Sequence, residues 1–126
     1  MIANSGHDER GAFTGGKAGD QTGGEWQIQK WYSRPWTHVF RYPSRKAAEL
    51  IAELAKEAAN NNLIGYDQSQ RTTFWQQLTK SGYHPANIKT ACEADCSAGV
   101  AAIVKAAGML LNNDELRSVS KDMYTG

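Results

Sequence analysis

The strongest constraint on the fold is a run of small and apolar residues at positions 98–107, Ala-Gly-Val-Ala-Ala-Ile-Val-Lys-Ala-Ala, which follows Asp95-Cys96-Ser97. A small polar residue ahead of such a helix-forming run is typical of a helix start, so Asp95 or Ser97 is expected as the N-cap. Gly108 is expected to end the helix as its C′ residue. The pattern therefore predicts a helix whose first turn contains Cys96.

Cys96 is a candidate nucleophile because of this place in the helix. Unpaired backbone N–H groups and the positive end of the helix dipole favour a thiolate over a thiol. A cysteine at a helix start can equally be a small buried apolar residue, and that alternative stays open. Cys92 lies four residues earlier, but no second pair of Cys or Cys-His ligands follows. No metal site is expected, and two cysteines so close together are expected to be reduced thiols.

Length and net charge limit the number of domains and the kinds of partner to be expected. The chain has 126 residues, which is enough for one domain with a modest core. A formal net charge of +1 gives no long-range attraction to nucleic acid or to an acidic membrane, so neither partner is expected. The sequence lacks a charged start followed by an apolar segment and lacks a run of membrane-spanning length, so synthesis in the cytoplasm is the expectation.

Residues 1–25 are crowded with Gly, Asp, Asn, Ser and Thr, and they show no periodicity. This composition predicts a loop, and by itself it is also typical of a flexible tail. If the loop is ordered near a cleft, Asp20, Gln21 and Glu25 would bring short polar groups close to a ligand. No Gly-Lys-Ser or Gly-Lys-Thr is present, so a phosphate-binding loop is not supported.

Residues 26–42 are aromatic and β-branched, and they predict two short strands or a hairpin with a turn at Ser33-Arg34-Pro35. The density of tryptophan in this segment allows two interpretations. Trp31 and Trp36 form either a stacking platform for sugars or a peptide, or a part of the core. Burial is favoured, because large aromatic side chains dominate the cores of small domains.

Helical spacing predicts a helix that begins after Ser44 and ends at Asn60, a second from Ser69 or Gln70 to Lys80, and a short last one through about Ser120. The chain is therefore expected to be a single α+β domain over residues 1–126, mostly helical. Its expected parts are a Gly-rich loop at 1–25, short strands at 26–42, a helical part with the Cys96 helix at 43–108, and a short C-terminal helix within 109–126.

Several segments together resemble a known family. Asp95-Cys96-Ser97 before a helix of small residues resembles the nucleophile motif of the NlpC/P60 cysteine peptidases, whose fold is related to papain. The segments Gly15–Glu25, Trp31–Trp36 and Ile64–Gln68 resemble the amino-terminal part of an endolysin-like branch of that family, found in phages and prophages of Gram-positive bacteria. The resemblance extends to about Gly108.

The resemblance implies a cysteine endopeptidase that cleaves stem-peptide bonds of peptidoglycan, without a cofactor. Cys96 would be the nucleophile, and backbone N–H groups beside Asp95 and Ser97 would stabilise the oxyanion. Tyr66 and Asp67 would contact the substrate, although Tyr66 could instead pack in the core and Asp67 could cap the following helix. A phage lysin made in the host cytoplasm would act at the bacterial cell wall.

The resemblance also exposes a gap. In these enzymes the general-base histidine lies downstream of the cysteine, on a strand of a sheet. No histidine follows Cys96 here, so the chain is expected to be the helical lobe without the sheet half. A downstream segment or a second chain would then supply the histidine. His38 and His84 precede Cys96 and are weaker candidates for the base, since a loop histidine is usually just solvated.

A function from another class competes with catalysis. A non-catalytic module that binds the cell wall would use Trp31, Trp36 and the glycine-rich loop as its surface. The two functions differ in what they require of Cys96, because an enzyme needs an exposed and activated thiol and a binding module does not.

Overall fold

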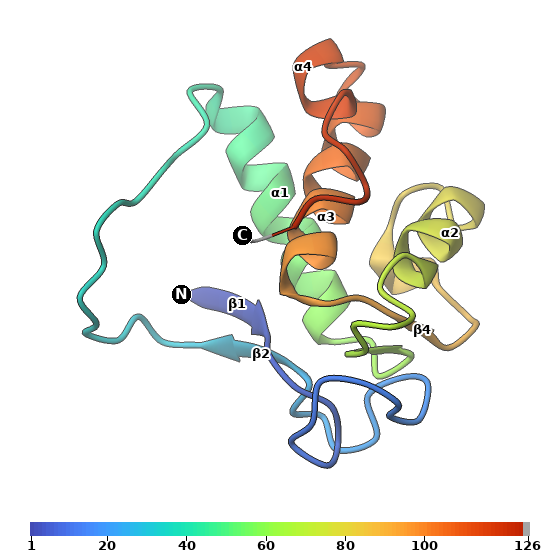
Figure 1. The fold of residues 1–126 in the computed structure, drawn as a ribbon. Coiled ribbons are helices and arrows are strands. Elements are labelled where there is room, and N and C mark those ends of the chain that lie inside the picture. Colours follow the sequence, from blue (N-terminus) through green and yellow to red (C-terminus); the bar gives the residue numbers. More distant parts are fainter. Residues whose placement is uncertain (125–126) are drawn as a thin grey trace.

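The computed structural model describes residues 1–124, which form an α+β fold in which helices predominate (Figure 1). The predicted fold class is therefore confirmed. In chain order the elements are β1 (Ile2–Ser5), β2 (Trp26–Gln29), α1 (Arg45–Ala59), β3 (Ile64–Gly65), α2 (Thr73–Lys80), the 3-10 helix η1 (Pro85–Asn87), β4 (Cys92–Glu93), α3 (Cys96–Leu111) and α4 (Asp114–Arg117).

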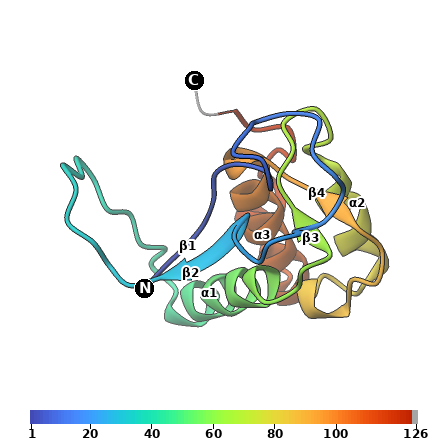
Figure 2. The same cartoon turned by 90° about the horizontal axis from the view of Figure 1, so that it is seen from below.

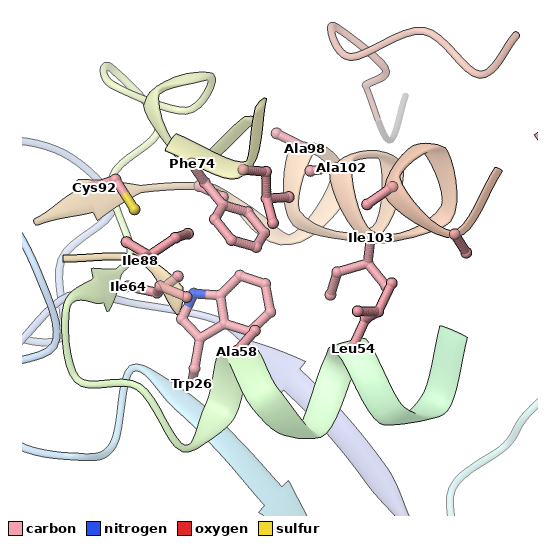
Figure 3. Packing of buried hydrophobic residues seen from close by; sticks show 14 residues of the cluster. Trp26, Leu54, Ala58, Ile64, Phe74, Ile88, Cys92, Ala98, Ala102 and Ile103 are labelled. Atoms are coloured by element: carbon pink, nitrogen blue, oxygen red, sulfur yellow. The ribbon is translucent and has the colours of Figure 1, made fainter. Parts of the chain in front are cut away.

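Helix α3 occupies the middle of the fold, and α1, α2 and α4 pack against it (Figures 1 and 2). Most of this helix is buried, and its buried residues have mainly small side chains, so the neighbouring elements approach it closely. Trp26 lies between α1 and α3, and its ring meets Phe74 of α2 edge-on at a centroid distance of 5.5 Å (Figure 3). The core is thus built from side chains of β2 and the three longest helices, joined by Ile64 of β3, Ile88 and Cys92 of β4, with Leu54 of α1 fully buried within it.

Two small sheets connect the amino-terminal segment with the helices. β1 and β2 pair antiparallel, with Ser5 opposite Trp26, and they lie against α1 and α3 (Figure 2). β3 and β4 pair parallel, with Gly65 opposite Glu93. Because only two residues separate the end of β4 from the start of α3, the parallel pair fixes where that helix starts.

The first two helices begin and end for local reasons. The hydroxyl of Ser44 caps α1 by accepting from the Ala47 N–H, and α1 ends at Ala59 with Asn60 as its C-cap, as the pattern predicted. α2 ends at Lys80 as predicted but begins later than expected, at Thr73, with Thr72 as its N-cap. The suggestion that Asp67 caps this helix is therefore wrong.

The predicted end of the Cys96 helix is also wrong. α3 continues past Gly108 to Leu111, and Asn112 in the left-handed conformation, with φ of 51°, provides its C-cap. Gly108 is required for a different reason. A Cβ there would lie 2.6 Å from the backbone carbon of Leu116, so the glycine allows α4 to pack closely against α3.

The strand predictions for the amino-terminal part are partly wrong. Residues 2–5 form β1 rather than loop, and β2 pairs with β1 instead of with a strand at residues 37–42. The hairpin prediction failed because the partner of β2 lies more than twenty residues upstream, where local periodicity gives no signal. Residues 30–44 instead swing away from the rest of the fold as an irregular connection (Figures 1 and 2).

Among residues 1–124, no helix combines the length and the apolar character that a membrane crossing needs.

The contact between α3 and Trp26 allows a stability test. A Cβ at Gly99 would lie 2.7 Å from Cη2 of Trp26, so Gly99→Ala must displace the indole. We expect this substitution to lower the free energy of unfolding by about 1–3 kcal/mol, although alanine is the better helix former. Urea denaturation measures the change. Gly6→Ala, where nothing lies within 4 Å, is the matched control. Equal stability of both variants would contradict the proposed contact.

Candidate active site

Cys96 is the first residue of α3, and its side chain is exposed. The short parallel pair β3–β4 and the N-cap residue Asp95 hold it in place. The first helical hydrogen bond runs from the Gly99 N–H to the Asp95 carbonyl. The Ala98 N–H donates to the Asp95 side chain, and within residues 1–124 the N–H groups of Cys96 and Ser97 have no acceptor. Two free donors therefore lie beside the exposed thiol.

Asp95 is the N-cap of α3, and its carboxylate is fully used. It accepts from the Ala98 N–H at 2.7 Å, from the Ser97 hydroxyl at 3.0 Å and from Nε of Arg71 at 2.6 Å. Burial raises the pKa of Asp95, but the hydrogen bonds from Arg71, Ala98 and Ser97 outweigh it and hold the pKa below its usual range. The cap is thus a carboxylate at neutral pH, and Ser97 supports it rather than replacing it.

Arg71 is a site residue that the sequence reasoning missed. It is only 9% exposed, and besides Asp95 its guanidinium contacts the Ser97 hydroxyl and the Met123 carbonyl. The ring of Tyr124 stacks against it at 3.9 Å from the guanidinium carbon to the ring centroid. The one signal in the sequence is a cation just ahead of a helix start, where the helix dipole disfavours it.

The two cysteines lie in opposite environments. Both are free thiols, as predicted, but Cys92 is buried in the core and its Sγ lies 3.7 Å from the Leu63 carbonyl oxygen. Burial raises the pKa of Cys92 to about 12, and the neighbouring Glu93 adds to this shift. Cys92 is therefore the inert structural thiol, and Cys96 is the accessible one. No cluster of three His, Cys, Asp or Glu side chains suited to a metal ion occurs within residues 1–124.

A cavity of about 400 Å³ opens beside Cys96, between β1, α1 and α3. Its walls are mainly aliphatic, with the indole of Trp26 at one side and polar groups at only a few points. The lining residues are Met1, Ala3, Asn4, Ser5, Trp26, Ala48, Ile51, Ala52, Ala55, Lys56, Cys96, Val100, Ile103 and Val104.

Tyr66 follows β3 and is buried, with 3% of its surface exposed. Burial raises the pKa of Tyr66, and negative charge at Cys96 and Asp95 raises it further, so the phenol stays neutral. Its hydroxyl accepts from the Gln68 amide at 3.1 Å. Asp67 instead accepts from the Ser69 and Gly15 N–H groups and thereby holds a turn and the glycine-rich loop.

The glycine-rich loop is ordered by its own polar side chains. The carboxylate of Asp20 accepts from five backbone N–H groups, those of residues 22–26. The side-chain amide of Gln21 donates to the carbonyls of Ala18 and Gly19. The alternative of a flexible tail is therefore wrong for this segment. Asp20 and Gln21 build the loop, and their role in substrate binding stays a prediction.

Two buried carboxyl groups meet where this loop touches the parallel strands. Oε2 of Glu93 and Oε2 of Glu25 lie 2.6 and 2.8 Å from the place a Cβ would take at Gly65, so they are close neighbours. Glu25 accepts from the Tyr66 N–H, and Glu93 accepts from the Gly19 N–H, but Oε2 of Glu93 has no partner among the described residues.

Burial raises the pKa of Glu93 to about 7, and the charges of Glu25, Asp67 and Glu9 act in the same direction. Burial likewise raises the pKa of Glu25, against the effect of its backbone hydrogen bonds. This pair is the second feature that the sequence reasoning missed, since no local pattern connects residue 25 with residue 93.

Neither candidate base lines the cavity at Cys96. His84 precedes η1, and its Nδ1 lies 3.0 Å from Oε1 of Glu57. His38 lies on the irregular connection and stacks on Phe40 at 5.7 Å between ring centroids. His7, the remaining histidine, follows β1, and its Nδ1 lies 2.8 Å from the Asp8 carbonyl oxygen.

The tryptophans divide between the core and the surface. Trp26 is buried, whereas Trp31 and Trp36 are 56% and 43% exposed, with ring centroids 5.6 Å apart. The expectation that the tryptophans of this segment are buried is therefore wrong for Trp31 and Trp36. They lie on the connection that swings away from the helices, where no neighbouring element covers them.

The site of this α+β domain is thus an exposed cysteine at the start of a buried helix, with a cavity and, within residues 1–124, two N–H donors without an acceptor beside it. Comparison with family models identifies the family of the chain. The model described as "Endolysin-like domain" matches residues 2–126, and the chain belongs to this family. No curated protein and no solved structure matches it. Membership gives the protein a hydrolase-like role related to the bacterial cell wall.

The buried ion pair at the N-cap predicts strong coupling between its two residues. Arg71→Gln leaves the Asp95 carboxylate buried without a cation, and we expect the free energy of unfolding to fall by about 3–5 kcal/mol. Adding Asp95→Asn removes the unpaired charge while an N-cap acceptor remains, so the double variant should recover part of this loss. Urea denaturation of the four proteins of the cycle measures the coupling, and strictly additive losses would contradict it.

The Glu25–Glu93 pair predicts a pH dependence of stability. With its pKa raised to about 7, Glu93 keeps a proton in the folded state that the unfolded chain has lost above pH about 4.3. The resulting stabilisation is complete below that pH and disappears as the pH rises through 7. In Glu93→Gln the amide can donate to Glu25, so we expect this variant to exceed the wild type by about 1–3 kcal/mol at pH 8 and to match it near pH 4.

Thermal or urea unfolding between pH 4 and pH 8 tests this expectation. Glu53→Gln on the exposed face of α1 is the control and should keep the wild-type profile. A Glu93→Gln variant with an unchanged pH profile would show that Glu93 does not keep its proton up to neutral pH in the folded state.

Proposed function

We propose that this protein is a peptidoglycan hydrolase, a cysteine endopeptidase of NlpC/P60-like type that cleaves stem-peptide bonds with Cys96 as the nucleophile. The observation that carries the proposal is the position of Cys96, exposed at the first residue of α3 beside two N–H groups that have no acceptor within residues 1–124. Membership of the endolysin-like family supplies the cell-wall context.

The arrangement at the helix start suits acyl transfer. Sγ of Cys96 would attack the carbonyl carbon of a stem-peptide bond, and the carbonyl oxygen would take the negative charge. The N–H groups of Cys96 and Ser97 point out of the helix start and are the natural donors for this oxyanion. The C–N bond then breaks, the amine leaves with a proton, and water hydrolyses the thioester.

The general base is proposed to come from outside the described residues. A downstream segment or a second chain would bring an imidazole to the open side of Cys96, because none of His7, His38 and His84 lines the cavity. The buried Arg71–Asp95 pair would keep the helix start rigid while this partner docks. Tyr66 and Asp67 are proposed as substrate contacts from the family resemblance, and neither of them lines the cavity at Cys96.

We further propose that the protein is made in a phage-infected or prophage-carrying host and acts on the peptidoglycan of that cell. A second candidate function, a wall-binding module, is favoured by one observation. Trp31 and Trp36 are exposed side by side on the irregular connection, an arrangement that can stack on a sugar face.

Release of new amino groups from purified Gram-positive peptidoglycan tests the proposal. The wild type, Cys96→Ser and the control Cys92→Ala are compared with and without added imidazole, which can replace an absent histidine side chain. We expect imidazole to raise release by the wild type and by Cys92→Ala on the order of tenfold or more. Cys96→Ser should show no release in either condition.

Folded wild-type protein that stays inactive with imidazole, yet sediments with the wall, would reject the peptidase and support the binding module. In that case Trp31→Ala should abolish sedimentation, whereas the proposed enzyme would keep its cysteine-dependent cleavage of soluble stem peptides in the same variant.

A further inference from the structure

The lining of the cavity beside Cys96 indicates the kind of molecule that the cavity can bind. It lies between β1, α1 and α3, and aliphatic side chains such as Ile51, Val100 and Ile103 form most of its surface. A volume of about 400 Å³ falls in the range of small-ligand sites. The cavity lining contains no carboxylate among the described residues, so its polar character comes from a few groups only.

Ser5 is the first of these groups. It is the last residue of β1, is 8% exposed, and its hydroxyl has no hydrogen-bond partner among the described residues. Leaving a buried hydroxyl unpaired costs about 1–3 kcal/mol. The oxygen is inaccessible in its present rotamer, but Ser5 lines the cavity together with Cys96, so rotation about its Cα–Cβ bond would present the hydroxyl to a polar atom of a bound molecule.

Lys56 is the second group. It lies on α1 at the rim of the same cavity, and its ammonium forms no ion pair or hydrogen bond within residues 1–124. The adjacent Glu57 is occupied by His84 and by the Ala86 N–H. Glu53, one turn earlier, is exposed and does not line this cavity. Among the described residues, Lys56 is therefore the one side-chain cation that lines this apolar cavity, and Met1, which carries the α-amino group, lines it as well.

We propose that this cavity binds a small aliphatic group that carries a carboxylate, with Lys56 as the counter-ion and the Ser5 hydroxyl as a hydrogen-bond donor. The aliphatic walls accommodate the hydrocarbon part, and the carboxylate replaces the anion that the lining lacks. The assignment of this group to a stem peptide, whose residues combine methyl side chains with free carboxylates, rests on the proposed function. Lys56 would then determine specificity for substrates with a free carboxylate over their carboxamides.

Alkylation of Cys96 tests the site without any need for peptidase activity. Iodoacetate and iodoacetamide alkylate a thiol by the same step, in which the sulfur displaces iodide and forms one S–C bond. Only iodoacetate carries a carboxylate. The rates for the two reagents are measured on the wild type, Lys56→Gln and Lys46→Gln. Lys46 is an exposed lysine of the same helix that does not line the cavity. The buried Cys92 does not contribute to the signal.

We expect the ratio of the iodoacetate rate to the iodoacetamide rate to fall about three- to fivefold in Lys56→Gln and to stay unchanged in Lys46→Gln. Raising the salt concentration should lower the wild-type ratio toward that of Lys56→Gln, because salt screens an exposed charge. Ser5→Ala should also lower the ratio, by about twofold, while its thermal stability remains that of the wild type or higher.

An unchanged ratio in Lys56→Gln, or an equal fall in Lys46→Gln, would overturn the proposal. The experiment distinguishes failure of this proposal from failure of the proposed function. A lysine-dependent ratio in a protein that never cleaves peptidoglycan would keep the carboxylate site and reject the peptidase. Cysteine-dependent cleavage with no effect of Lys56→Gln on the ratio would support the peptidase and reject the carboxylate site.

Discussion

The buried ion pair between Arg71 and Asp95 is the interaction on which the site depends. It joins the segment before α2 to the N-cap of α3, and the same guanidinium reaches the Met123 carbonyl near the other end of the sequence. A buried charged pair is stable only if the remaining polar groups around it form hydrogen bonds. Here Arg71 also donates to the Ser97 hydroxyl, and Asp95 also accepts from the Ala98 N–H at the helix N-terminus. Cys96 therefore stays exposed on a backbone that is fixed from several sides.

Local signals in the sequence were sufficient for the parts of the fold that local physics determines. Ser44 and Asn60 delimit α1, and Asp95 begins the helix that presents Cys96, because caps and helical spacing act within a few residues. The fold class followed from the same signals. The exposure of Cys96 and the burial of Cys92 did not, since spacing alone left the role of each thiol open.

The remaining features depend on contacts between distant residues. β1 exists because β2 pairs with it, and Gly108 serves the packing of α4 although glycine usually indicates a helix end. Arg71 and the carboxyl pair of Glu25 and Glu93 acquire their roles only when segments far apart in the chain meet. Such contacts override local preference, and a single sequence contains no record of which segments will meet.

Trp26 places a condition on how this chain folds during synthesis. Its indole N–H donates to the Gly65 carbonyl, its ring packs on Phe74, and its edge contacts Gly99. Every one of these partners follows it by dozens of residues, so the interior cannot close until α3 has left the ribosome. Closing such long loops is slow, and the nascent chain must keep a large aromatic side chain exposed in the meantime. The domain is therefore expected to fold as one unit, late in synthesis.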